Sequence, residues 1–185
     1  MRDSGTVLAA APDGARVGPV ADEQFASRAA VIVGWREWVS LPSLGIARIK
    51  AKLDTGARTS ALHALRSDRY TERGVPHVRL HVQPRQRDGG PVLVVETAII
   101  DERTVSDSSG HRERRIVVAS ELTLGEDRWP IELTITNRDS LRFRMLLGRS
   151  AMQDHLIIDP DRSYVLGKPD KAKSKVARRA RPHPP

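Results

Sequence analysis

The sequence predicts an all-β fold. Its apolar residues are mainly Val, Ile and Leu, and only 4% of all residues are aromatic. Side chains branched at Cβ favour strands over helices. Many short apolar or alternating segments follow one another closely, with turn residues between them and little helical periodicity. Short strands in this arrangement are typical of a closed or sandwiched β fold.

The first expected strands are residues 31–33, 35–39 and 49–53, with a turn at Pro42 and Gly45 before the third. In residues 49–53, apolar side chains alternate with Lys50 and Lys52, which is the period of a half-buried strand. The later expected strands are residues 78–82, 92–100, 115–118, 121–124, 131–136, 143–147 and 156–158. Residues 131–136 alternate most regularly, which predicts a strand with one buried face.

Turns and one helix complete the expected elements. Residues 88–90, 125–127 and 159–161 are rich in Asp, Gly and Pro, which predicts turns. One short helix is expected from Arg149 to about residue 154. The sequence therefore predicts a small β protein in which helix plays a minor part.

The chain is long enough for one domain with a tail at each end. Residues 1–29 show no sustained period and are expected to be disordered. The folded domain is expected over residues 30–167. Residues 168–185 form an expected disordered tail, with seven basic residues against one acidic residue, Asp170. This tail accounts for most of the formal net charge of +8, so the domain itself is nearly balanced.

Two absences bear on location. The sequence has no cysteine, which excludes disulfides and thiolate metal ligands and favours a reducing cytoplasm. The apolar stretch at residues 7–11 ends at Pro12 and is too short for a signal-peptide core or a membrane span. We therefore expect a cytoplasmic protein with no membrane partner.

The most informative motif is Asp54-Thr55-Gly56, which follows the strand expected at residues 49–53. A carboxylate on a tight turn at the tip of a strand is the arrangement that an aspartic peptidase needs. Gly56 permits the turn and a close approach of the backbone. The tripeptide alone also fits an ordinary turn, but the strand that precedes it favours catalysis.

A second element downstream strengthens this interpretation. Residues 145–152 run from an apolar strand through Leu147-Gly148-Arg149 towards the expected helix. Together with Asp54-Thr55-Gly56-Ala57, this element resembles the active-site motifs of the retropepsin-like aspartic peptidases, which are closed β-barrels. More specifically, residues 52–64, 136–138 and 146–149 are similar to a bacterial branch labelled "ATP-dependent zinc protease". The resemblance covers roughly residues 31–167.

The resemblance implies a site and an assembly. The catalytic residue of the implied site is Asp54. The turn that holds it consists of Thr55, Gly56 and Ala57, and the support behind it consists of Leu147, Gly148 and Arg149. The chemistry needs two close carboxylates, one of them protonated, because two like charges at that distance cannot both ionise. The sequence holds one Asp-Thr-Gly, so we expect the second carboxylate from Asp54 of another copy in a homodimer. Thr55 would then bond across the dimer axis.

Enzymes of this kind cover the cleft with a flexible hairpin, the flap. Residues 84–91 are one candidate, and residues 101–114 are favoured because they are longer and flanked by expected strands. The tip of the favoured flap consists of Asp107, Ser108, Ser109 and Gly110. A plain surface loop is the alternative for both segments.

Arginines gather around the favoured flap and near the final motif. They are Arg103, Arg112, Arg114, Arg115, Arg138, Arg142 and Arg144. If they faced the cleft, they would favour an acidic peptide as substrate. The alternative is a solvated face on which they pair with acidic residues such as Glu102 and Glu113.

No metal or nucleotide cofactor is expected. The six histidines form no His-Glu-x-x-His motif, and His77 and His81 lie four apart in an expected strand. The sequence also has no Gly-rich phosphate loop of the ATPase type. A role for ATP would therefore have to come from a partner.

The resemblance also implies a partner and a substrate. Members of this branch are associated with ATP-grasp glutamate ligases that add glutamates to a ribosomal protein, so a glutamate-rich peptide or protein tail is an expected substrate. Two other functions stay open. One is a non-catalytic peptide-binding module of the same fold. The other is an adaptor for RNA or ribosomes that binds phosphates weakly through the basic tail.

Overall fold

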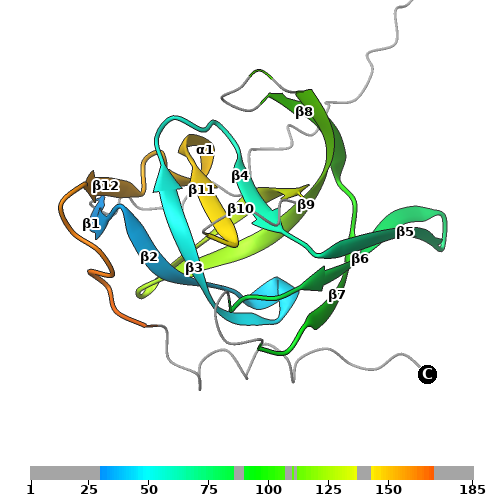
Figure 1. Ribbon diagram of the computed structural model, residues 1–185, viewed down its shortest axis with the longest axis horizontal. Coiled ribbons are helices and arrows are strands. Elements are labelled where there is room, and N and C mark those ends of the chain that lie inside the picture. Colours follow the sequence, from blue (N-terminus) through cyan, green and yellow to red (C-terminus); the bar gives the residue numbers. More distant parts are fainter. Residues whose placement is uncertain (1–29, 86–89, 107–109, 111, 137–142, 169–185) are drawn as a thin grey trace, which may run out of the picture.

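The computed structural model describes residues 30–85, 90–106, 110, 112–136 and 143–168 (Figure 1). The expected N-terminal segment at residues 1–29 lies outside these residues, and so does the expected tail at residues 168–185 apart from Lys168. The described part is mostly β-structure with one short α-helix, as the sequence predicts. None of its helices is long and apolar enough to cross a membrane.

A ring of hydrogen-bonded strands forms the centre of the molecule. Its order is β10–β4–β11–β3–β2–β9, and a direct pairing of β9 with β10 closes it. The ring strands are β2 (Arg36–Leu41), β3 (Ile46–Asp54), β4 (Ser60–His63), β9 (Arg112–Leu124), β10 (Asp127–Thr136) and β11 (Met145–Gly148). This closed arrangement confirms the expected fold class.

Smaller elements surround the ring. β1 (Val31–Gly34) pairs in parallel with β12 (Leu156–Asp159), and β8 (Asp101–Ser106) extends the ring beyond β9. A separate sheet contains β5 (Arg66–Glu72), β6 (Val75–Val82) and β7 (Leu93–Ala98). The short helices are η1 (Pro42–Leu44) and α1 (Arg149–Met152).

Alternation along β3 explains why Asp54 lies where it does. Ile49, Ala51 and Leu53 are buried in the core, whereas Lys50 and Lys52 are half-buried on the opposite face. Side chains two residues apart on a strand lie on the same face. Asp54 therefore shares the outer face of β3 with the two lysines, at the end of the strand.

The C-terminal segment at residues 162–166 holds the β1–β2 junction beside β3. The fully buried Glu37 accepts hydrogen bonds from the backbone N–H groups of Gly34 at 2.8 Å and Val165 at 2.7 Å. Leu53 in turn donates its N–H to the carbonyl oxygen of Trp35 at 2.9 Å. The end of β3 that carries Asp54 is thus held by the β1–β2 junction, which the C-terminal segment at residues 162–166 secures in turn.

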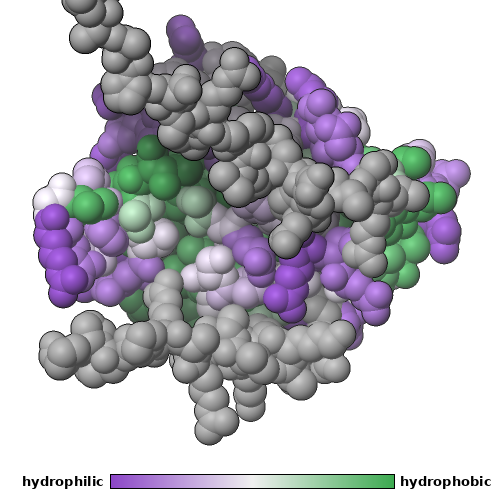
Figure 2. Space-filling model, turned by 180° about the vertical axis from the view of Figure 1, so that it is seen from behind, coloured by the Kyte–Doolittle hydropathy of each residue, from purple (hydrophilic) through white to green (hydrophobic). Residues whose placement is uncertain are grey.

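The end of the molecule that carries β1 and β12, which we call the apolar end, exposes two large apolar side chains. Ile32 of β1 and Ile157 of β12 are direct register partners and are both exposed. Figure 2 shows apolar surface at the end that carries β1 and β12, at the right of the view. The other edge of β12 is unpaired within the described part of the chain.

Two of the expected strands are wrong in detail. Residues 115–118 and 121–124 belong to one continuous strand, β9, because Ala119 and Ser120 continue the pairing with β10. β10 also lacks the expected polar face at its end, where Thr134 and Thr136 are buried. Thr134 satisfies its hydroxyl there by donating to the carbonyl oxygen of Ser60 at 2.8 Å.

Three elements differ from the pattern because local signals were weak. β4 and β5 were not expected, and α1 ends at Met152 rather than near residue 154. β5 is polar and largely exposed, so it has no apolar alternation. Its hairpin with β6 turns at Arg73 and Gly74, which both have positive φ, and arginine is an uncommon residue in that conformation.

Candidate active site

The Asp54 turn, which we define as residues 54–59, joins β3 to β4. The backbone N–H groups of Gly56 and Ala57 donate to Oδ1 of Asp54 at 3.0 and 3.2 Å. The ammonium of Lys52 donates to Oδ2 at 2.9 Å. The two oxygens of one carboxylate therefore have different partners. We call Oδ1, which accepts from the backbone amides, the inner oxygen, and Oδ2, which accepts from Lys52, the outer oxygen.

These contacts shift the acidity of Asp54. The hydrogen bond from Lys52 is the main cause that holds the pKa of its carboxyl below the ordinary value, and the two backbone N–H groups act in the same direction. Burial acts in the opposite direction but is outweighed. An isolated protomer thus favours an ionised Asp54, which is one of the two forms that acid–base catalysis by a carboxylate pair requires.

β11 lies beside the Asp54 turn. It runs parallel to β3, with Leu147 beside Leu53 and Gly148 beside Asp54. Leu147 is fully buried, and the Gly148 N–H donates to Oγ of Ser60 at 3.1 Å. A Cβ on residue 148 would lie 2.5 Å from the carbonyl carbon of Thr59, so only glycine fits here without movement of the backbone.

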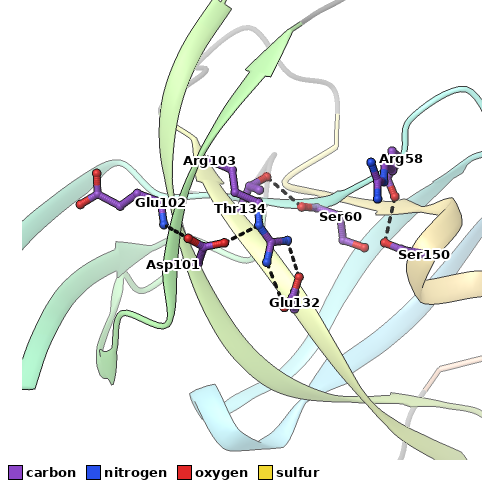
Figure 3. Close-up of polar contacts among 8 residues, drawn as sticks. All are labelled: Arg58, Ser60, Asp101, Glu102, Arg103, Glu132, Thr134 and Ser150. Atoms are coloured by element: carbon purple, nitrogen blue, oxygen red, sulfur yellow. Dashed lines mark hydrogen bonds and ion pairs between the residues drawn. The ribbon is translucent and has the colours of Figure 1, made fainter.

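Helix α1 fastens the other side of the turn. The Arg149 guanidinium donates through Nη1 to the carbonyl oxygens of Thr55 at 2.6 Å and Gly56 at 3.1 Å. The Arg149 N–H donates to the carbonyl oxygen of Ala57 at 2.9 Å. Ser150 donates its N–H and its hydroxyl to the Arg58 carbonyl, and the hydroxyl contact is drawn in Figure 3. The first two residues of α1 thus bind the consecutive carbonyl oxygens of residues 55–58.

The structure places the predicted catalytic, turn and supporting residues around this one turn. Thr55 is exposed at its tip and Asp54 is partly covered, so both face outward from the protomer. The sequence reasoning missed Lys52, Ser60 and Ser150. Lys52 had a usable signal, because it lies two residues before Asp54 in an alternating strand and must share its face.

The favoured flap is a hairpin of β8 and β9, whose pairing runs from Asp101–Val117 to Ser106–Arg112. Its predicted tip residues Asp107, Ser108 and Ser109 lie outside the described residues, whereas Gly110 is exposed with φ of +83°. In Figure 1, β8 and the Asp54 turn both lie in the upper part of the view. The role of this hairpin as a flap stays a prediction.

The arginines near this hairpin pair with acidic residues. Arg103 contacts Asp101 and Glu132, as Figure 3 shows. Arg114 lies 2.7 Å from Glu102, and Arg115 lies 2.7 Å from Glu113. All three charges are thus offset by acidic partners. Arg114 is exposed and fits the solvated-face alternative, whereas Arg115 is buried.

The remaining arginines of the predicted cluster have no acidic partner among the described residues or themselves fall outside them. Arg112 is exposed, and Arg138 and Arg142 fall outside the described residues. Arg144 is half-buried, and its Nε and Nη1 atoms have no hydrogen-bond partner among the described residues. The arginines of this cluster that the structure describes therefore give no support to a cationic cleft.

The histidines give no metal site in the described part of the chain, where no group of three or more His, Asp and Glu residues could hold an ion. His77 and His81 lie on the outer face of β6. Their Nε2 atoms lie 3.7 Å from Glu72 and 3.6 Å from Asp68, each in a separate pair. The geometry there is that of surface pairs along a hairpin.

Known proteins resemble this chain along most of its length. It matches the family described as RimB-like, retropepsin-like aspartic endopeptidase RimB, over residues 32–169. A probable alpha-L-glutamate ligase of Shewanella pealeana is 43% identical over 136 residues, and one of Parasynechococcus marenigrum is 44% identical over 137 residues. Both matches cover 74% of this chain but only 30% and 29% of the relatives. The chain thus spans less than a third of their length.

A solved structure agrees with the fold. A Legionella pneumophila protein of unknown function (DUF785) matches with a TM-score of 0.61 and 26% sequence identity. The match covers 73% of this chain and 97% of that protein. The family match spans most of the chain and includes the Asp54 turn with its support from β11 and α1. The chain therefore belongs to the RimB-like family of retropepsin-like aspartic endopeptidases.

Proposed function

We propose that this protein cleaves peptide bonds as a homodimer, with the two Asp54 carboxylates facing each other across a twofold axis. The observation that carries this proposal is the Asp54 turn, which presents one carboxylate at the end of β3. The sequence has no second Asp-Thr-Gly. Each protomer thus supplies half of the carboxylate pair that the reaction needs.

The pair would act on a water molecule held between the two carboxylates. The ionised carboxylate takes a proton from the water as its oxygen attacks the carbonyl carbon of the peptide. The protonated carboxylate gives its proton to the carbonyl oxygen. Collapse of the tetrahedral intermediate then passes a proton to the departing amine. The backbone N–H groups of Gly56 and Ala57 keep the inner oxygen of Asp54 in place during these steps.

The protomer offers surface for such a dimer. Thr55 is exposed at the tip of the turn, and the apolar end with Ile32 and Ile157 lies on elements that adjoin it. β12 follows α1, which fastens the turn, and β1 leads into Trp35, which pairs with Leu53. An unpaired strand edge beside exposed apolar side chains readily pairs with a second copy.

We further propose acidic, glutamate-rich peptides as substrates. Three cations lie on the face that ends in Asp54, since Arg36 and Lys52 are cross-strand partners and Lys50 precedes them along β3. We call Arg36, Lys50 and Lys52 the cation row. The relatives that share this domain are named probable alpha-L-glutamate ligases, which supports a link between this peptidase and glutamate ligation.

The test is hydrolysis of matched peptides in the presence of EDTA from pH 4 to 8. One peptide carries a run of glutamates, and its control carries glutamines at the same positions. We expect cleavage of the glutamate peptide by the wild type, read by mass spectrometry. We expect at least a hundredfold loss in Asp54→Asn, because both protomers of that variant lose the carboxylate and no general acid–base group remains.

The control results separate the alternatives. Asp54→Asn should keep its fold, because asparagine retains an oxygen for the Gly56 and Ala57 amides. Cleavage that EDTA abolishes would contradict the metal-free mechanism. Peptide binding without turnover would favour the alternative of a non-catalytic peptide-binding module. Equal cleavage of the glutamine peptide would contradict the preference for acidic substrates but not the peptidase activity.

A further inference from the structure

The contact between Lys52 and Asp54 is the feature that the peptidase mechanism does not use. The Lys52 ammonium lies 2.9 Å from Oδ2, the oxygen that the backbone amides leave free. The Lys52 side chain is 45% exposed and that of Asp54 is 24% exposed, so the pair lies at the surface where a second copy or a substrate would arrive. The contact is therefore within the site yet accessible from outside.

This contact conflicts with one state of the reaction. A protonated ammonium can only donate hydrogen bonds, so it favours a proton-free oxygen at Oδ2. A pair of carboxylates that shares a proton needs one such oxygen to hold it. If both protomers kept the Lys52 contact, both outer oxygens would be proton-free, and the general acid of the reaction would be missing.

We propose that Lys52 is a positioning residue of the peptidase, whose ammonium holds the outer oxygen of Asp54 free of its proton and must leave one protomer's Asp54 before the pair becomes active. This inference rests on the proposed function. The flexible and partly exposed lysine stem permits such a movement. Since Lys52 favours the ionised carboxylate, it shifts the active range towards acidic pH.

The other charges near Asp54 are engaged differently. Arg149 of α1 binds the carbonyl oxygens of Thr55 and Gly56, and it also stands at the edge of the turn. Arg36 of β2 lies over the rings of Trp35 and Tyr164 and donates through Nε to Ser163. Arg58 follows in the turn and is exposed, and β11 contributes the uncharged Gly148.

The test compares Lys52→Met with Lys50→Met. Lys50 is a matched control, since it lies on the same face about 7 Å further along the strand and its ammonium is over the Trp38 ring. The first readout is the pH titration of the Asp54 carboxyl carbon by NMR, identified by its absence from the Asp54→Asn spectrum. The second readout is the pH profile of kcat/KM on the glutamate peptide.

The sign follows from the charge. Loss of a cation that favours the ionised form raises the pKa of the Asp54 carboxyl, so both limbs of the pH profile move to higher pH. We expect an upward shift of about one pH unit or more in Lys52→Met. In Lys50→Met, kcat/KM on the glutamate peptide should fall because a cation of the row is lost, but the pH profile and the Asp54 titration should move by much less. Lys52→Arg, which keeps the charge, should stay close to the wild type. Lys52→Gln gives a second neutral variant if the methionine variant folds poorly.

The results separate two claims, the control of the Asp54 proton by Lys52 and the proposed peptidase function. An Asp54 titration that is the same in Lys52→Met, Lys52→Gln and wild type would overturn the role of Lys52. Loss of activity in Lys52→Met with an unmoved pH profile would also overturn the role of Lys52 and would mean that Lys52 only stabilises the structure. If no variant and no wild type cleaves peptide, the proposed function fails, but the NMR titration still decides whether Lys52 controls the Asp54 proton.

Discussion

At the scale of single residues, the Asp54 turn depends on what each atom contacts. Asp54 has two backbone donors on one oxygen and a lysine on the other. Gly148 is the counterpart of Asp54 on β11, and its backbone packs against that of Thr59. The sequence pattern identified both residues, because a Gly after an apolar strand and an Asp-Thr-Gly are local signals. It missed Lys52 as a partner, although the alternation of β3 places both side chains on one face; only the contact itself depends on rotamers.

A methyl group at position 148 tests the close approach. Gly148→Ala should lower the free energy of unfolding by about 1–3 kcal/mol, because the added Cβ has no space beside the Thr59 backbone. It should also lower kcat by displacing the Asp54 turn. Urea unfolding and peptide hydrolysis measure the two effects.

Gly34→Ala is the matched control for this variant. Its added Cβ would overlap the Arg162 carbonyl, so stability should fall in the same way. The change lies away from the Gly148–Thr59 contact, so kcat of the folded enzyme should fall less. Equal losses of kcat in both variants would contradict a specific role for Gly148 in placing Asp54.

At the scale of elements, the site is built by segments far apart in the sequence. β3 provides Asp54, β11 lies beside it in parallel, and α1 fastens the turn through Arg149. The segment at residues 162–166 then secures the β1–β2 junction through Glu37. Alternation predicted β3 and β11 well. It failed for β5, which has no buried face, and for β9, where continued pairing with β10 overrides the break in the pattern.

The buried Glu37 gives an element-scale prediction. Glu37→Gln should destabilise the protein by about 1–3 kcal/mol. The amide oxygen can still accept from Gly34 and Val165, but the new NH₂ takes the place of the oxygen that accepts from the Leu166 N–H and cannot accept a hydrogen bond. Glu96→Gln on the exposed surface of β7 is the control and should change stability little. Similar unfolding midpoints for both variants in urea would contradict this role of Glu37.

At the scale of the whole molecule, the sequence predicted the fold class, the paired motifs and the family. These depend on local sequence patterns, which can be identified without knowing how distant segments pack. It could not predict the surroundings of the arginines near β8 and β9, which depend on how β8, β9 and β10 come together. There, Arg103 meets Glu132 of a distant strand. The sequence left a cationic cleft and a solvated face open for these arginines. In the folded chain Arg103, Arg114 and Arg115 pair with carboxylates, and the cation row lies on the face that ends in Asp54.

The central claim is that one active site needs Asp54 from two copies. We would mix wild type with Asp54→Asn at constant total concentration, let protomers exchange, and measure cleavage of the glutamate peptide. With random pairing and two essential carboxylates, an equal mixture should retain about a quarter of the wild-type rate, because only that share of dimers has both. A rate near one half, falling in proportion to the wild-type fraction, would contradict the shared site and show that each protomer acts alone.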